Sequence, residues 1–132
     1  MDYIIDNKKV FSFDTGESID KKKDTLILLH GSGQSHVVWS LTSQYISDQN
    51  YNVITVDLPG HGYSEGDSLK SIEEMATWLE KLRKVIGVEK LFLAGHSQGC
   101  LIALEYAYKY PSKIKKLIFI AGSYKLPVNK NL

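Results

Sequence analysis

The stretch Gly95-His96-Ser97-Gln98-Gly99 decides the fold of this chain, because it matches the pattern Gly-x-Ser-x-Gly. An apolar run at residues 91–94 precedes it, and a helical pattern over residues 100–110 follows it. The pattern gains a chemical meaning where a strand turns sharply into a helix at the serine, since the turn exposes the hydroxyl. The alternative is a chance match in an ordinary loop, which the flanking elements disfavour. We therefore expect an exposed serine between two glycines, because side chains in their place would collide.

The rest of the chain alternates short apolar runs with helical patterns. We expect a β-hairpin from residues 3–5 and 10–13, buried strands at residues 25–29, 53–57, 91–94 and 116–121, and helices beginning near residues 35, 71 and 99. Strands that alternate with helices indicate parallel β-α-β units. The predicted fold class is therefore α/β, a mostly parallel twisted sheet with helices on both faces.

Local signals define two of these helices. Ser71 and Glu74 form a predicted capping box, and Gly87 is the predicted stop of the same helix. In the helix that begins near residue 35, apolar residues recur at offsets of three and four, which is typical of one apolar helix face. These residues are Val38, Leu41, Tyr45 and Ile46.

The predicted strand ends gather the residues that could carry chemistry. Sites in such sheets form at the carboxyl ends of the strands, so the loops after Leu29 and Asp57 should meet the turn at Ser97. A serine nucleophile needs a nearby base, a group that orients the base, and donors for the oxyanion. The backbone N–H groups of Ser32 and Gln98 are the predicted donors, and losing one such donor typically costs about 10²–10³ in rate.

Three segments resemble the signature segments of the α/β-hydrolase fold family: residues 30–33 (His-Gly-Ser-Gly), 57–64 (Asp-Leu-Pro-Gly-His-Gly-Tyr-Ser) and 95–99. They occur in the family's order and at its kind of spacing. The resemblance implies an eight-stranded sheet and a catalytic triad in the order serine, acid, histidine, with Ser97 as nucleophile and Ser32 and Gln98 as oxyanion donors. The residues expected to shape the supporting loops are His30, Gly31, Gly33, Asp57, Gly60, Gly62, Gly95 and Gly99.

The chain departs from this family after the serine. No histidine follows Ser97, and the only later carboxylate side chain, Glu105, lies inside a predicted helix. The triad acid and histidine are therefore expected outside this chain. Complete folds of this type run to roughly 200–250 residues, and residues 122–128 resemble the entry to the family's lid. We expect residues 1–132 to be a single partial domain, truncated after about the sixth strand, without the lid and the later strands.

The four histidines have other expected roles. His30 is expected to fix the oxyanion loop, and His61 to shape the loop in which it lies. The side chain of His96 should diverge from that of its neighbour Ser97, and His36 should be a surface residue at a helix start. Cys100 is expected to be a small apolar residue packed on the sheet.

Composition excludes several other classes of function. A net charge of +1 gives no reason to expect nucleic acid or an anionic membrane as a partner. The run Lys21-Lys22-Lys23 lies beside aspartates and is expected to be a solvated loop. No apolar run approaches the ~18 residues of a membrane helix, and no signal-like stretch opens the chain, so we expect a cytoplasmic location. No metal cluster or nucleotide loop is evident, so we expect no cofactor.

Two hypotheses of function follow. The first is a serine hydrolase that cleaves a small ester or related acyl substrate through an acyl-enzyme on Ser97. The second is an inactive truncated product, or an interaction module that keeps the first half of the fold. In either case one edge of the strand at residues 116–121 should be bare, which favours self-association.

Overall fold

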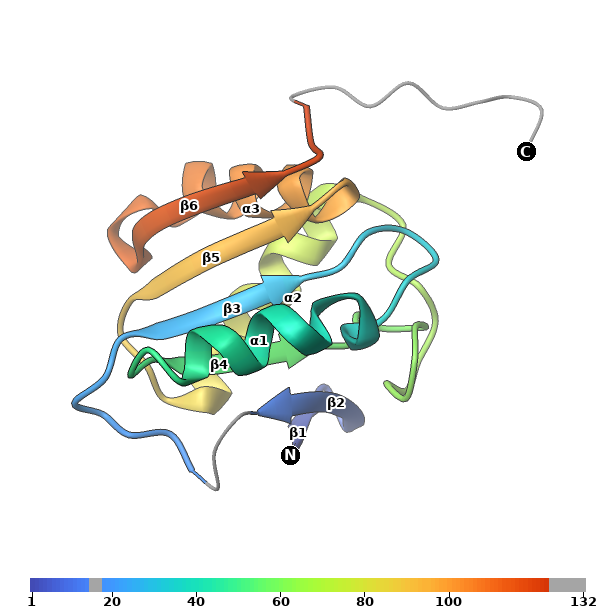
Figure 1. Ribbon diagram of the computed structural model, residues 1–132. Coiled ribbons are helices and arrows are strands. Elements are labelled where there is room, and N and C mark those ends of the chain that lie inside the picture. The colour runs from blue at the N-terminus through green and yellow to red at the C-terminus, as the bar shows by residue number, and fades with distance from the viewer. Residues whose placement is uncertain (15–17, 124–132) are drawn as a thin grey trace.

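A six-stranded sheet with helices on both faces forms the protein in the computed structural model, which describes residues 1–14 and 18–123 (Figure 1). The elements, in chain order, are β1 (Asp2–Ile5), β2 (Lys8–Asp14), β3 (Thr25–Leu29), the 3₁₀ turn η1 (His36–Trp39), α1 (Ser40–Ser47), β4 (Asn52–Val56), α2 (Ile72–Ile86), β5 (Leu91–His96), α3 (Gln98–Lys109), the 3₁₀ turn η2 (Pro111–Lys113) and β6 (Ile114–Ile120). The predicted α/β class is confirmed. Most of the segment that resembles a lid entry, from residue 124 onward, lies outside the described residues.

The order of strands across the sheet is β1-β2-β4-β3-β5-β6. Strands β4, β3, β5 and β6 are parallel to one another. Strands β1 and β2 form the predicted hairpin, and β2 joins the sheet antiparallel to β4. The two residues of the hairpin turn, Asp6 and Asn7, both have positive φ values, 51° and 61°. Such a turn matches the right-handed twist of the strands that it joins.

The connections of β3 and β5 leave the sheet on opposite faces. Helix α1 follows β3 and covers one face, whereas α3 follows β5 and lies with α2 on the other face (Figure 1). In an open parallel sheet, adjacent strands with diverging connections leave a crevice at their carboxyl ends. Here the register pairs Leu29 of β3 with Gly95 of β5, so the crevice lies just beyond these two residues.

Strands β3 and β4 are buried on both faces, as predicted from their continuous apolar sequences. In β3, Ile27 and Leu29 pack in the core beneath α2 and α3, while Leu26 and Leu28 pack in a second core that includes Trp39. No helix of the described segments is both long and apolar enough to cross a lipid bilayer.

The prediction for the face of the first helix is wrong for most of its residues. Val38, Leu41 and Tyr45 are exposed, and of the predicted positions only Ile46 packs against the core. The predicted helical segment begins with the 3₁₀ turn η1, which the side chain of Ser35 caps, and α1 starts only after this turn. Because a 3₁₀ turn has 3.0 residues and an α-helical turn 3.6, the change of helix type shifts the buried face to Trp39 and Ser43.

The prediction that the last strand is buried is also wrong. In β6, Ile118, Phe119 and Ile120 are 44%, 50% and 42% exposed. The strand pairs with β5 on one side and, within the described residues, with nothing on the other. The predicted bare edge is therefore present, and it explains the exposure.

A buried ionic group joins α2 to α3. Arg83 donates two hydrogen bonds to the carboxylate of Glu80, at 2.9 and 2.7 Å, and the hydroxyl of Tyr106 donates a third at 2.6 Å. The hydrogen bonds from Arg83 hold the pKa of Glu80 below its ordinary value, and burial raises the pKa of Tyr106. A fully bonded buried charge orients its neighbours, and here it fixes α3 against α2.

We expect Tyr106→Phe to lower the free energy of unfolding by about 1–3 kcal/mol, because the buried carboxylate of Glu80 loses a donor. Urea unfolding of the variant would measure this. The matched control is Tyr108→Phe, since Tyr108 lies on the same helix but is 81% exposed. Equal stability of the two variants would contradict a structural role for the Tyr106 hydroxyl.

Candidate active site

Ser97 lies at the turn between β5 and α3, where the sequence predicts it. Its backbone is strained, with φ 54° and ψ −117°, a region that residues other than glycine seldom occupy. The turn is held on both sides: the Ser97 N–H donates to the carbonyl oxygen of Ile120 at 3.1 Å, and the Ser97 carbonyl accepts from Cys100 at 3.0 Å. The predicted strand–turn–helix context of the serine is confirmed.

The glycines that flank the serine provide space rather than backbone freedom. A Cβ on Gly95 would lie 2.2 Å from the carbonyl oxygen of Gly99, so the predicted collision across the turn is confirmed for Gly95. A Cβ on Gly99 would instead lie 2.5 Å from the carbonyl oxygen of Leu29, at the end of β3. The positive φ is at Ser97 and at neither of these glycines.

The glycine-rich loop after β3 contacts the serine turn directly. A Cβ on Gly31 would lie 3.1 Å from the Cβ of Ser97 and 2.9 Å from Oε1 of Gln34. Gln34 Oε1 also accepts a hydrogen bond from Nδ1 of His96 at 3.0 Å, so one side chain joins the loop to the turn. The predicted convergence of these segments at the carboxyl ends of β3 and β5 is confirmed.

Three backbone N–H groups of this loop, those of Gly31, Gly33 and Gln34, have acceptors within it or in the loop after β4. Gly31 donates to Gln34 Oε1 at 2.8 Å, and Gly33 donates to His61 Nε2 at 3.3 Å. The N–H groups of Ser32 and Gln98 have no hydrogen-bond acceptor in the part of the chain that the structure describes. An oxyanion at Ser97 would require unpaired N–H groups of this kind.

His30 is fully buried behind the loop and joins it to the loop after β4. Its Nδ1 lies 2.7 Å from the carbonyl oxygen of Gly31, and its Nε2 accepts from the N–H of Leu58 at 3.0 Å. These partners assign the proton to Nδ1 and leave the imidazole neutral. Burial lowers the pKa of His30, in agreement with that assignment.

The two glycines of the loop after β4 allow it to fold over Asp57. Gly60 and Gly62 have φ values of 74° and 50°. A Cβ on Gly62 would meet the Asp57 carboxylate, and a Cβ on Gly60 would lie 2.5 Å from the N–H nitrogen of Ser68. His61, between them, donates to the carbonyl of Pro59 and packs its ring 5.1 Å from that of His30.

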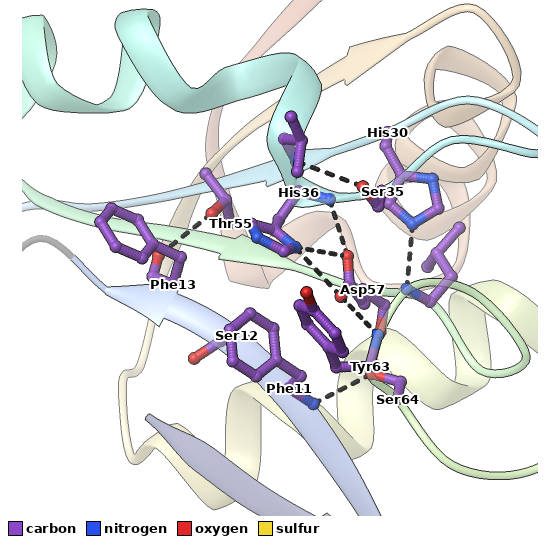
Figure 2. Close-up of polar contacts among 12 residues, drawn as sticks. Phe11, Ser12, Phe13, His30, Ser35, His36, Thr55, Asp57, Tyr63 and Ser64 are labelled. Carbon is purple, nitrogen blue, oxygen red and sulfur yellow. Dashed lines mark hydrogen bonds and ion pairs between the residues drawn. The ribbon is translucent and has the colours of Figure 1, made fainter.

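The side-chain partner of Asp57 is one that the sequence alone does not predict. Figure 2 shows the buried Asp57 carboxylate facing the ring of His36, which lies 2.9 Å away at Nδ1. The carboxylate also accepts from the backbone N–H groups of His36 and Tyr63, at 2.7 and 2.9 Å. The prediction that His36 is a surface residue is therefore wrong, since its side chain is only 14% exposed. The signal available in the sequence was a histidine shortly after one strand, β3, and an aspartate at the end of the next strand, β4.

Ser97 has no base within the described residues. Among the described residues, no histidine or carboxylate hydrogen-bonds to the Ser97 side chain. Each histidine instead has a partner on the segments at the carboxyl ends of the strands. These pairs are His30 with Leu58, His36 with Asp57, His61 with Gly33, and His96 with Gln34. Nor does any group of three possible metal ligands converge in residues 1–14 and 18–123.

Known proteins share this fold. A family model described as the alpha/beta hydrolase fold matches residues 24–131. The chain is 29% identical over 120 residues to an (E)-2-((N-methylformamido)methylene)succinate hydrolase of Acinetobacter baylyi, covering 90% of this chain and 43% of that protein. It is 38% identical over 113 residues to a probable lysophospholipase, BODYGUARD 2, of Arabidopsis thaliana, covering 79% and 24%. A solved membrane phospholipase A superposes with a TM-score of 0.86 at 28% identity, over 98% of this chain and 41% of that one. The chain thus spans less than half the length of each.

The neutral state of His30 predicts how stability depends on pH. Because its pKa is lowered by burial, the unfolded chain binds a proton at His30 more readily than the folded chain. The contribution of His30 is therefore complete above the unfolded pKa of about 6.5 and is lost as the pH falls below it. We expect the free energy of unfolding, from urea titrations, to fall on acidification, and to fall less steeply in His30→Gln. Equal slopes in both proteins would contradict the assignment.

Proposed function

Because the chain belongs to the α/β-hydrolase fold family, we propose that it supplies the nucleophile and the oxyanion donors of a serine hydrolase. The substrate is a small ester or a related acyl compound, and the reaction passes through an acyl-enzyme on Ser97. Serine at the turn between β5 and α3 supports an acyl-enzyme, since its hydroxyl can form an ester with the substrate's acyl group.

The strained backbone of Ser97 is the observation that carries this proposal. A non-glycine residue at φ 54° costs of order 1–3 kcal/mol, and such residues concentrate at functional sites. The strain turns the residue into the crevice between the ends of β3 and β5, where sites form in parallel sheets. Gly31 faces it closely, since a Cβ on Gly31 would lie 3.1 Å from the Cβ of Ser97.

The proposed reaction uses one side chain and two backbone groups of this chain. The oxygen of Ser97 attacks the carbonyl carbon of the substrate while its proton passes to a base. The oxyanion that forms accepts hydrogen bonds from the N–H groups of Ser32 and Gln98. When the tetrahedral intermediate collapses, the alcohol leaves with a proton from the base. Water then attacks the acyl-enzyme by the same route and releases the acid and free Ser97.

The base and the acid that orients it come, in this proposal, from residues outside 1–132. The four histidines of the chain are joined to other loops, and the described residues place no carboxylate beside the Ser97 side chain. The relatives above are more than twice as long, which leaves room for both groups. Two of the three are named as phospholipases or lysophospholipases, which supports an ester as the substrate.

A fluorophosphonate probe tests both parts of the proposal. We expect little or no labelling of the 132-residue chain, because Ser97 lacks a base, and any slow labelling should map to Ser97 by mass spectrometry and vanish in Ser97→Ala. Ser32→Ala is the matched control and should behave as the unaltered chain, since it keeps its backbone N–H. Strong labelling that is lost in Ser97→Ala would contradict the need for an outside base, whereas labelling elsewhere would contradict the nucleophile.

The DNA that follows the codon for Leu132 separates the enzyme from the inactive alternative. An open frame with a further aspartate or glutamate and a late histidine would support the hydrolase. A stop codon followed by unrelated sequence would favour a non-catalytic product that keeps this part of the fold.

The bare edge of β6 supports a separate proposal, that copies of the 132-residue chain associate through it. Its unpaired backbone groups and the exposed side chains of Ile118 and Phe119 form a template for another strand. Sedimentation over a wide concentration range should show association that Ile118→Lys reduces. Leu41→Lys is the control, since Leu41 is 89% exposed on α1. A concentration-independent monomer, or an equal effect of both variants, would contradict the proposal.

A further inference from the structure

A basic hollow of about 470 Å³ lies at the opposite end of the sheet from Ser97. It is formed by the segment before β3, the turn between α2 and β5, and the start of β6. The lining residues are Lys21, Lys22, Lys23, Asp24, Thr25, Gly87, Val88, Glu89, Lys90 and Lys115. Strand β3 runs from this hollow to the crevice at Ser97, and its five residues span roughly 15 Å. The two places are therefore separate (Figure 1).

The acidic side chains of the hollow are already paired. The Asp24 carboxylate accepts from Lys115 at 2.5 Å, and the Glu89 carboxylate accepts from Lys113 at 2.6 Å. Within residues 1–14 and 18–123, the ammonium groups of the other four lining lysines have no such partner. These four are Lys21, Lys22, Lys23 and Lys90.

Four backbone carbonyl groups of the hollow also have donors within the protein. Arg83 donates from beneath to the carbonyl oxygens of Val88 and Glu89, at 2.6 and 3.3 Å. Asn52 donates to the carbonyl oxygens of Lys23 and Asp24, at 3.3 and 2.9 Å. The hollow thus presents free cationic donors, while its two carboxylates and four of its carbonyl groups are bonded to the protein. A ligand that complements this surface must bring negative charge and hydrogen-bond acceptors.

We propose that this hollow binds a compact soluble polyanion that carries two or more phosphate groups. Four unpaired lysines in one concavity match several negative charges better than one, and the volume lies in the range of small-molecule sites. Lysine binds phosphate as a point charge, whereas arginine binds it through paired hydrogen bonds. The only arginine of the sequence, Arg83, is already bonded to Glu80, Val88 and Glu89.

Calorimetric titration of the 132-residue chain with tripolyphosphate at low ionic strength tests the proposal. We expect one-to-one binding that weakens as salt is added, because exposed charges are screened. The double variant Lys22→Gln/Lys90→Gln should weaken binding about tenfold, since it removes two of the four free charges. Lys70→Gln is the matched control, as Lys70 is an exposed lysine at the start of α2, and it should change the affinity less than about twofold. Amide NMR shifts on binding should be confined to residues 20–25, 87–91 and 114–116, which line the hollow or flank its lining residues.

Four results would overturn the proposal: no saturable binding of tripolyphosphate, an equal loss of affinity in the double variant and the control, NMR shifts elsewhere on the molecule, or binding of orthophosphate as tight as that of tripolyphosphate. Two further arms examine other sources of phosphate. Vesicles rich in anionic lipid and a single-stranded oligonucleotide should each bind more weakly than tripolyphosphate. If either binds while tripolyphosphate does not, a surface for a membrane or for nucleic acid replaces the small-molecule site.

Discussion

The close packing of the first turn of α3 on the end of β3 is the constraint on which the rest of the site depends. It is possible only because residue 99 is glycine, whose backbone approaches the carbonyl oxygen of Leu29 too closely for a side chain. This contact sets where α3 begins, and the helix start in turn fixes the strained backbone of Ser97 and the direction of the Gln98 N–H. On the other side, Gly31 brings the loop after β3 against Ser97. The buried group of Glu80, Arg83 and Tyr106 then holds α3 in place from beneath.

The histidines around the crevice serve as connections between loops. His30 joins the ends of β3 and β4, His61 joins the same two loops nearer the surface, and His96 joins the serine turn to Gln34. His30 uses Nε2 as an acceptor from the backbone N–H of Leu58, so it must be neutral for the two loops to keep this contact. A histidine near a serine therefore need not be its base, and the pairing of each ring nitrogen decides the question.

Much of the fold was predictable because its signals are local. The continuous apolar runs defined β3, β4 and β5, and Ser71, Glu74 and Gly87 marked α2 to the residue. The turn at Ser97 was equally clear, since the sequence places a strand and a helix on either side of it. The errors arose where distant contacts decide: Asp57 draws in His36, 21 residues away, and a 3₁₀ turn rotates the helix that follows. The burial of β6 depends on neighbours that its own sequence does not specify.

The backbone of Ser97 has a consequence for how this protein can change over evolutionary time. Glycine would occupy the same φ and ψ without strain, so substitution of this serine by glycine would relieve a local conflict in the native state. Selection for stability alone would therefore tend to remove the Ser97 hydroxyl. A lineage that keeps serine at this turn retains a less stable fold together with the hydroxyl. Strain at this residue therefore indicates that selection for the hydroxyl has outweighed selection for stability.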